Sequence, residues 1–325
     1  MIREQGPMYA VSPLDGRYAD RTAPLVEYAS EAALMRARVR VEVEYLLALA
    51  DLEAVPIDVE PDEVDALEAL YRGFAREDAT LIKRIETTGA RGYAATNHDV
   101  KAVEYYLREH APERLHPWLH FGLTSEDVNN LAYRLLVGDA IESVVVPELR
   151  TIRDALVESA HGYADLPMLA RTHGQPATPT TFGKEMAVYA SRLGRCLVDV
   201  ESAADSLAGK LAGASGTYAA HNVAFPDVDW PAFAEEFVDS LGLDHQPLTT
   251  QINPGDDLAA LFDALGRVNQ VLLDLDRDMW LYVSDRYLGQ RSDDDETGSS
   301  TMPHKVNPID FENSEGNLSK ANSDL

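Results

Sequence analysis

The sequence predicts an all-α protein, in which a bundle of long helices follows a smaller N-terminal helical domain. Over most of the 325 residues, apolar side chains recur every three or four positions with charged side chains between them, which is the spacing of amphipathic helices. The apolar–polar alternation typical of strands is almost absent. Three of the periodic stretches cover about 30 residues, or about 45 Å of helix. We therefore expect a bundle that buries its long faces against other subunits.

The first part of the chain is expected to form the shorter helices. Periodic spacing predicts them over 24–54, 62–86 and 98–110. Asn97 is expected to cap the last of these. Prolines within 112–117 then interrupt the pattern. We place a domain boundary near residue 115, so that 1–115 form an N-terminal helical domain and 116–325 the central long-helix bundle.

The second part of the chain carries the long periodic stretches. They cover about 125–156, 180–211 and 255–289. Ser125 is expected to cap the first of them, because acidic residues follow it in the first turn. Pro147 is expected to kink the same helix.

The chain is strongly acidic, with 55 acidic and 28 basic residues and a net charge of −27. Such a surface repels phosphate backbones and anionic membranes, so we expect no nucleic-acid partner and no membrane partner. It also predicts a halophilic protein, because salt at 1 M screens self-repulsion beyond about 3 Å. No stretch of about 18 apolar residues is present, and we expect a cytoplasmic protein.

The cysteine content limits the kinds of site that the chain can hold. The single cysteine, Cys196, excludes an internal disulfide and a multi-cysteine metal site. The helical spacing around it predicts a buried structural residue. The sequence contains no glycine-rich phosphate loop and no dinucleotide fingerprint. We therefore expect no cofactor and no metal.

The most specific segment lies near the end of the sequence: Gly298-Ser299-Ser300-Thr301-Met302-Pro303-His304-Lys305-Val306-Asn307-Pro308. Its glycine and serines predict a mobile loop rich in hydrogen-bond donors, and its lysine suits an anionic small molecule. The segment fills every fixed position of GSSxMPxKxNP and so resembles the signature of the fumarase/aspartase superfamily. The following residues 309–318 and three further blocks, at 12–18, 96–105 and 171–179, narrow the resemblance to the adenylosuccinate lyase family.

This resemblance implies a β-elimination in purine nucleotide biosynthesis. Fumarate would be released from adenylosuccinate, giving AMP, and from the succinylated imidazole-carboxamide ribotide SAICAR, giving AICAR. His173 matches the general acid that protonates the leaving group, and Ser299 matches the general base. On the residues alone, each would be an ordinary loop residue. The resemblance also implies a homotetramer whose active sites are each assembled from three subunits, without a cofactor.

The resemblance further implies a set of substrate-binding residues. They are Arg17, Tyr18, Asn97, His98, Asp99, His120, Thr124, Ser125, Gln251, Lys305, Val306, Asn307 and Asn313. Without the resemblance, Arg17 would be a surface ion-pair partner, and Asn97 and Ser125 would be helix caps. A helix N-terminus is itself an anion site, so capping and substrate binding are compatible.

Two alternatives stay open beside this function. Argininosuccinate lyase and fumarase share the signature loop, but they lack the extension at 310–313 and the block at 96–99. The second alternative is an inactive helical subunit that only associates with intact copies. It arises because the family pattern continues beyond Leu325 into the rest of the bundle and a small helical domain, which this sequence lacks.

Overall fold

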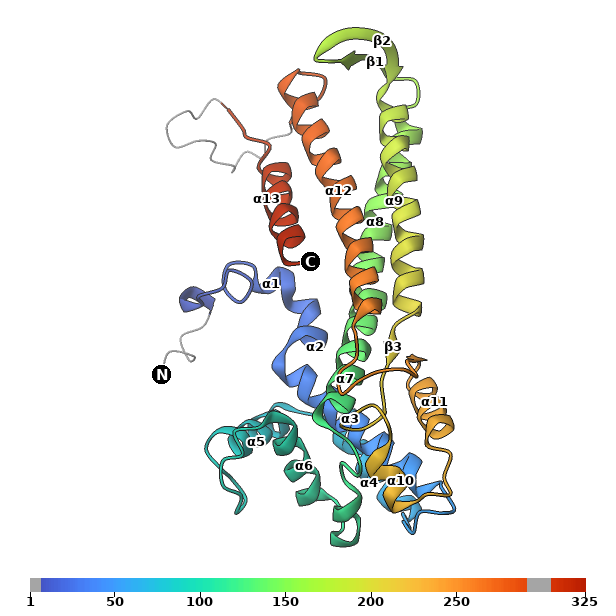
Figure 1. The fold of residues 1–325 in the computed structure, drawn as a ribbon. Helices are drawn as coiled ribbons and strands as arrows, with labels where there is room; N and C mark the ends of the chain where they lie inside the picture. The colour runs from blue at the N-terminus through green and yellow to red at the C-terminus, as the bar shows by residue number, and fades with distance from the viewer. Residues whose placement is uncertain (1–6, 291–304) are drawn as a thin grey trace. The chain divides into compact units, whose positions relative to one another are not determined.

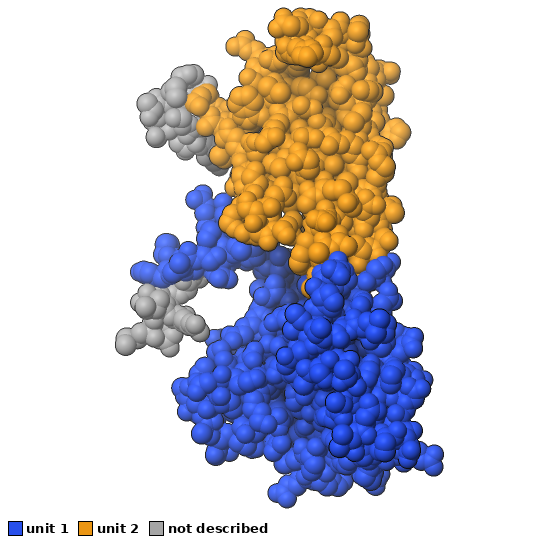
Figure 2. All heavy atoms as spheres, viewed as in Figure 1, with its two compact units in different colours: residues 1–144, 205–257 blue, residues 145–204, 258–325 orange. Residues whose placement is uncertain are grey.

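The structure is a computed structural model that describes residues 7–290 and 305–325 (Figure 1). As the periodicity predicts, the described residues are mostly helical. They divide into two compact units, coloured separately in Figure 2. Unit 1 holds residues 1–144 and 205–257, and unit 2 holds residues 145–204 and 258–325. The domain boundary expected near residue 115 stays a prediction.

Unit 1 is organised around one buried helix, α3 (Glu31–Ala50). The other α-helices of this unit are α1 (Ala19–Thr22), α2 (Val26–Ala29), α4 (Pro61–Arg72), α5 (Arg76–Thr87), α6 (Asp99–His110), α7 (Ser125–Ala140), α10 (Ala219–Ala224) and α11 (Trp230–Ser240). Short 3-10 helices cover Pro7–Tyr9, Ala23–Leu25 and Glu113–Trp118. Two short strands, β3 (Ala208–Gly209) and β4 (Asp244–His245), pair in parallel.

The core of unit 1 surrounds α3, which buries nine apolar residues along its length. Val39, Val43 and Leu46 pack in a cluster with buried residues of α4, α5 and α6. Tyr45 packs edge-on against Phe237 of α11, with ring centroids 5.6 Å apart. Two of the six charged residues of α3, Arg38 and Glu42, are buried with these apolar residues, and the other four are half-buried or exposed.

Two of the helix boundaries predicted for unit 1 were wrong. The stretch 62–86 forms two helices, α4 and α5, because Gly73 ends the first one and Asp78 caps the second by accepting the Ala75 N–H at 2.8 Å. The stretch 24–54 is divided at Ser30, whose Oγ accepts the Ala33 N–H at 3.1 Å and so starts α3. At both places a helix ends or begins at a local capping residue, although the apolar period of the sequence continues through it.

Unit 2 consists mainly of long helices that lie side by side (Figure 1). They are α8 (Val146–Gly162), α9 (Phe182–Asp205), α12 (Asp256–Ser284), whose residues from Leu258 onward belong to this unit, and α13 (Ile309–Asp324). Arg150 of α8 pairs with Glu201 of α9 at 2.7 Å, and Arg192 of α9 pairs with Asp274 of α12 at 2.7 Å. Arg277 of α12 pairs with Glu315 of α13 at 2.8 Å. The helices expected over 180–211 and 255–289 begin within two residues of their predicted starts and end five or six residues early, and the stretch expected over 125–156 is divided into α7 and α8.

The kink expected at Pro147 stays a prediction, but the helix type changes just before this residue. A π-helical turn (Ile141–Val145) separates α7 from α8, and Pro147 lies in the first turn of α8. A proline is tolerated there because the first N–H groups of a helix have no partner within it.

The near absence of strands expected in this region was wrong at one place. Strands β1 (Pro167–Thr172) and β2 (Gln175–Thr181) form an antiparallel hairpin, with Pro167 opposite Thr181 and Thr172 opposite Gln175. The sequence analysis missed this hairpin because most of its residues are exposed and show no apolar face.

Cys196 is half-buried on α9 rather than fully buried as expected. The neighbouring positions Leu193 and Leu197 carry the buried face of the helix instead. Among the described residues, no helix has both the length and the apolar character needed to cross a bilayer.

Candidate active site

Four of the predicted substrate-binding residues meet in unit 1. His98 Nε2 lies 3.4 Å from Ser125 Oγ, and Gln251 Nε2 donates a hydrogen bond to Thr124 Oγ1 at 3.3 Å. His98, Gln251 and Ser125 come from three segments that are far apart in the sequence. The fold therefore gathers them into one group, which we call the His98 cluster: His98, Thr124, Ser125 and Gln251.

Two helices begin at the His98 cluster. His98 is the N-cap of α6, and its Nδ1 accepts the Lys101 N–H at 3.2 Å. Thr124 is the N-cap of α7. Free N–H groups at a helix N-terminus carry partial positive charge and bind anions. This part of the cluster therefore suits a carboxylate or a phosphate.

The caps expected from the sequence, Asn97 and Ser125, were each wrong by one residue. An N-cap has extended backbone angles, which His98 and Thr124 adopt. Asn97 lies in the left-handed region with φ 48°, and Ser125 is already the first residue of α7. The hydroxyl of Ser125 is thereby left to face His98.

Asp99 holds the start of α6 in place. Arg38 of α3 is 4% exposed and donates from Nη2 to Asp99 Oδ2 at 2.6 Å and from Nε to Asn129 Oδ1 at 2.8 Å. Partial burial of Asp99 opposes its charge, but Arg38 and the Val100 N–H outweigh it, so the pKa of Asp99 lies below its usual value. Its Oδ1 is 3.7 Å from His98 Nδ1. Asp99 thus fixes the helix that carries His98 and faces the imidazole at longer range.

His120 is paired with a buried carboxylate. Glu42 of α3 is fully buried and accepts the His120 backbone N–H at 3.1 Å and its Nδ1–H at 2.5 Å. Burial disfavours a charged imidazole, but the charge and hydrogen bond of Glu42 outweigh it and raise the pKa of His120. The charged imidazole is favoured at this position, a few residues before the start of α7.

A buried ion pair supports the other half of the cluster. Lys210 and Asp127 are both fully buried, and Lys210 Nζ lies 2.8 Å from Asp127 Oδ1. Lys210 Nζ also donates to the Gln251 carbonyl at 2.7 Å. Asp127 Oδ2 accepts the Thr124 N–H at 2.8 Å. One ion pair therefore fixes the backbone on both sides of the hydrogen bond between Thr124 and Gln251.

These supporting residues were missed by the sequence analysis. Arg38 and Glu42 stand four positions apart in α3 and so lie on one face of a helix whose neighbouring residues, such as Val39 and Val41, are fully buried. The sequence does not single out this pair, because charged and apolar residues alternate from Arg36 to Glu44. Lys210 and Asp127 have no signal either, because they are distant in the sequence and are joined only by the fold.

The remaining predicted residues of unit 1 lie near its N-terminal end. Arg17 is exposed in the turn before α1, and Tyr18 is the N-cap of this helix. The Tyr18 N–H donates to the Pro13 carbonyl at 2.9 Å. The block at 12–18 is thus a compact turn.

His173 lies in unit 2, at the turn between β1 and β2. It is exposed and has φ 54°, and the following Gly174 has φ 70°. Two successive residues with positive φ are typical of the tight two-residue turn of a hairpin. The side chain therefore stands at the tip of a hairpin rather than in a loop between helices.

The predicted residues after the signature serine also belong to unit 2. Lys305 is exposed and its Nζ donates to Asn307 Oδ1 at 2.7 Å, while the Val306 carbonyl accepts from Gln290 Nε2 at 2.9 Å. Asn313 lies in the first half of α13, where its carbonyl accepts from Asn317. Ser299 lies outside the described residues.

The sequence is similar to lyases along nearly all of its length. A family model described as "Lyase" matches residues 16–322. Adenylosuccinate lyase of Escherichia coli strain K12 is 47% identical over 99% of this chain and 70% of its own length. The chain belongs to the adenylosuccinate lyase family. The enzymes of Haemophilus influenzae and Dictyostelium discoideum are 46% and 44% identical, each over 97% of this chain and 68% of their own lengths.

Solved structures show that the fold is that of the wider lyase group. A fumarate lyase from Mesorhizobium sp. BNC1 superposes with a TM-score of 0.67 at 23% identity, over 94% of this chain and 64% of its own. A 3-carboxy-cis,cis-muconate lactonizing enzyme from Pseudomonas putida gives a TM-score of 0.68 at 24% identity, over 93% of this chain and 64% of its own. The chain therefore spans a little under two thirds of these two proteins, and within that part the adenylosuccinate lyase family shares their helical fold.

Proposed function

We propose that the protein eliminates fumarate from adenylosuccinate, giving AMP, and from SAICAR, giving AICAR. The observation that carries this proposal is the 47% identity to the Escherichia coli adenylosuccinate lyase over 99% of the chain. The geometry of the His98 cluster supports it, because two helix N-termini and a row of hydroxyl and amide groups suit an anionic substrate.

In this reaction, a base removes a proton from the succinyl β-carbon and the C–N bond to the purine or imidazole breaks. The electron pair of the C–H bond forms the double bond of fumarate, and the departing nitrogen takes a proton from an acid. We assign the base to Ser299 and the acid to His173. A proton transfer by a positioned side chain accelerates such a step by about 10²–10⁴-fold.

The intermediate accumulates negative charge on a carboxyl group, and fixed donors would stabilise it. We propose that Thr124, Ser125 and Gln251 bind the succinyl part and that His98 lies beside them. The cluster can hold these donors still because the Asp127–Lys210 pair anchors the backbone of Thr124 and Gln251. Substrate contacts from Arg17, Tyr18, Lys305, Asn307 and their neighbours belong to the same proposal.

The test is turnover by the whole protein that carries this chain. Adenylosuccinate, argininosuccinate and fumarate are supplied in turn, and loss of substrate is followed by ultraviolet absorbance or chromatography. We expect turnover of adenylosuccinate alone. Activity on argininosuccinate, or hydration of fumarate to malate, would assign the chain to another branch of the superfamily. Ser299→Ala is expected to remove most turnover without loss of helix content, and a near-normal rate would refute its role as base.

We also propose that the chain assembles as a homotetramer in the cytoplasm. Exposed apolar side chains on the long helices of unit 2 support self-association, among them Val188 and Val198 on α9 and Trp280 and Leu281 on α12. Light scattering coupled to size exclusion gives the mass of the assembly, and a monomer at micromolar concentration would contradict the tetramer. A second experiment tests the predicted salt adaptation, since unfolding during dialysis to low salt is expected.

A further inference from the structure

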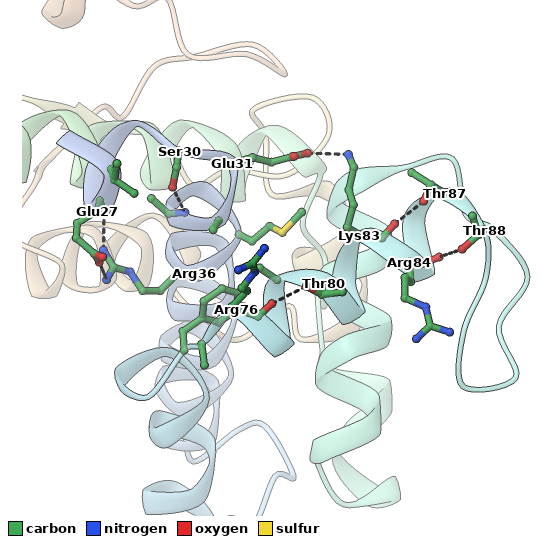
Figure 3. Close-up of a pocket in the computed structure, with 17 residues that line it drawn as sticks. Glu27, Ser30, Glu31, Arg36, Arg76, Thr80, Lys83, Arg84, Thr87 and Thr88 are labelled. Carbon is green, nitrogen blue, oxygen red and sulfur yellow. Dashed lines mark hydrogen bonds and ion pairs between the residues drawn. The ribbon is translucent and has the colours of Figure 1, made fainter. Parts of the chain in front are cut away.

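Unit 1 contains a hollow of about 510 Å³ lined by α2, the start of α3, and α5 (Figure 3). No residue of the His98 cluster lines it, and none of the other predicted substrate-binding residues does. The volume is within the range of about 300–1,000 Å³ that is common for small-molecule sites. The hollow is therefore large enough for a ligand of its own.

The lining of the hollow has more basic than acidic side chains, whereas the whole chain has more acidic than basic ones. The whole chain has 55 acidic and 28 basic residues. The hollow is lined by four basic side chains, Arg36, Arg76, Lys83 and Arg84, and by two acidic ones, Glu27 and Glu31. In a protein with a net charge of −27, an anion is attracted only where the local charge is positive.

The two carboxylates of the hollow are each paired with one cation. Arg36 Nη1 donates to Glu27 Oε2 at 2.9 Å, and Lys83 Nζ donates to Glu31 Oε1 at 2.7 Å. The hydrogen bonds of Lys83 to Glu31 and Glu86 raise its pKa, so that it stays charged. Glu27 and Glu31 are therefore both occupied by these two cations, and neither is available to pair with another basic side chain of the hollow.

Two cations of the lining, Arg76 and Arg84, take no part in these pairs. Arg76 is the one that lies between the two pairs (Figure 3). In the described part of the chain, its guanidinium has no ion pair and no hydrogen bond with a side chain. Figure 3 shows the Glu27–Arg36 and Glu31–Lys83 pairs at opposite ends of the hollow, with Arg76 between them in this view. A guanidinium can bind a carboxylate or phosphate through two parallel hydrogen bonds.

The rest of the lining combines apolar side chains with the hydroxyl groups of Ser30, Thr80, Thr87 and Thr88. Ala33 and Met35 are already buried, but Val26 is exposed and Phe74 and Ala79 are half-buried, so these three leave apolar surface in contact with solvent. A small inorganic anion would leave this surface in contact with water. A ligand that carries an apolar group as well as a charge would cover it.

We propose that this hollow binds a small organic anion, a carboxylate or phosphate ester with an apolar body. Its charged group pairs with Arg76, and its apolar body covers Val26 and Phe74. The site does not depend on the lyase reaction, because it shares no residue with the groups assigned to that reaction.

The test is a binding titration of the whole protein with phenyl phosphate, benzoate and inorganic phosphate. Calorimetry or ligand-observed NMR is carried out at the lowest salt at which circular dichroism shows the native fold. We expect phenyl phosphate or benzoate to bind at least tenfold more tightly than inorganic phosphate, and the tighter of the two identifies the preferred charged group. Arg76→Ala is expected to weaken the binding at least tenfold.

A matched control separates local binding from a loss of overall charge. Arg72 lies on α4, outside the hollow, with its side chain 64% exposed and paired with Glu68. Arg72→Ala removes the same charge and is expected to leave the affinity unchanged. Should Arg76→Ala fold poorly, Arg76→Gln keeps a side chain of similar length and serves in its place.

Several results would overturn the proposal. They are the absence of binding to the unaltered protein, equal affinity for inorganic phosphate, and equal weakening by Arg72→Ala. Displacement of phenyl phosphate by saturating adenylosuccinate would place the ligand in the lyase site instead. Loss of lyase activity with retained phenyl phosphate binding would contradict the proposed function alone.

Discussion

In unit 1, Thr124 and Gln251 rest on an ion pair that is fully buried, whereas in unit 2 His173 stands exposed at the tip of a two-stranded hairpin. The buried ion pair holds Thr124 and Gln251 in place through several backbone hydrogen bonds. The position of His173 depends only on the backbone of a tight turn. Both groups are proposed to act on one substrate, yet they are held by different physical means.

This difference predicts how the two regions respond to substitution. A side chain that supports a buried network contributes to folding as well as to function. An exposed side chain at a hairpin tip contributes little to folding. Substitution of His173 at the hairpin tip should therefore change activity alone, and substitutions beneath the His98 cluster should change stability as well.

The largest expected effect is that of His173→Ala on turnover. Loss of a general acid lowers kcat by about 10²–10⁴-fold, while the free energy of unfolding should change by less than about 0.5 kcal/mol, because the side chain is exposed. Adenylosuccinate turnover and urea denaturation measure the two quantities. His161→Ala, at an exposed position on α8, is the control. A large loss of stability in His173→Ala would contradict the contrast between the regions.

Lys210→Met should have the largest effect on stability. It leaves the Asp127 carboxylate buried without its cation, which costs about 3–5 kcal/mol of unfolding free energy. Urea denaturation measures the loss. Lys184→Met removes a lysine that is 63% exposed and should cost less than about 1 kcal/mol. Equal effects of the two substitutions would show that the buried pair does not support the fold.

The buried His221 should make stability fall at acid pH. Tyr45 donates to the Phe121 carbonyl at 2.9 Å, which assigns the proton of His221 to Nε2, 2.9 Å from the Tyr45 oxygen, and leaves Nδ1 buried without a partner. Burial accordingly lowers the pKa of His221 to about 4. Between pH 6.5 and 4 the unfolded chain takes up a proton that the folded chain does not, so stability present above pH 6.5 is lost as the pH falls.

Urea denaturation across this pH range tests the effect of His221. The shift corresponds to about 3 kcal/mol. The His221→Gln variant carries no titratable group at this position, so its stability should fall less steeply between pH 6.5 and 4. Equal slopes for the two proteins would show that His221 does not titrate in this way.

Glu42→Gln should have a smaller effect, with the opposite dependence on pH. Glu42 raises the pKa of His120, so the pair stabilises the fold below the ordinary histidine pKa and loses this contribution as the pH rises through the raised pKa. The variant should therefore lower the pKa of His120, as measured by NMR of its ring protons. An unchanged titration would show that Glu42 does not control the charge of this imidazole.

The smallest effect is expected for Arg171→Ala beside the hairpin tip. Arg171 pairs with Asp285 at 3.3 Å, and both side chains are more than a third exposed. Pairs of this kind contribute about 0–1 kcal/mol. Denaturation of the variant should be close to that of the unaltered protein. A loss as large as that of Lys210→Met would mean that the hairpin is held as firmly as the His98 cluster.

Much of the fold was predictable from the sequence because helices depend on neighbours a few residues apart. The period of apolar residues located α9 and α12 within a few positions. It failed at the hairpin around His173, where most side chains face solvent and the apolar period disappears. It also failed at Gly73, where α4 ends, and at Ser30, whose side chain caps the start of α3. The apolar period continues through both positions and does not reveal these local signals.

The sequence by itself determined the helical class and the family, because the periodicity and the signature at 298–308 are contained in short segments. Only the tertiary structure decided that Lys210 and Asp127 form a buried pair and that His98 meets Ser125. In both cases the two residues come from segments that are distant in the sequence. Burial of a charge depends on what the folded chain packs around it, and no local pattern encodes that.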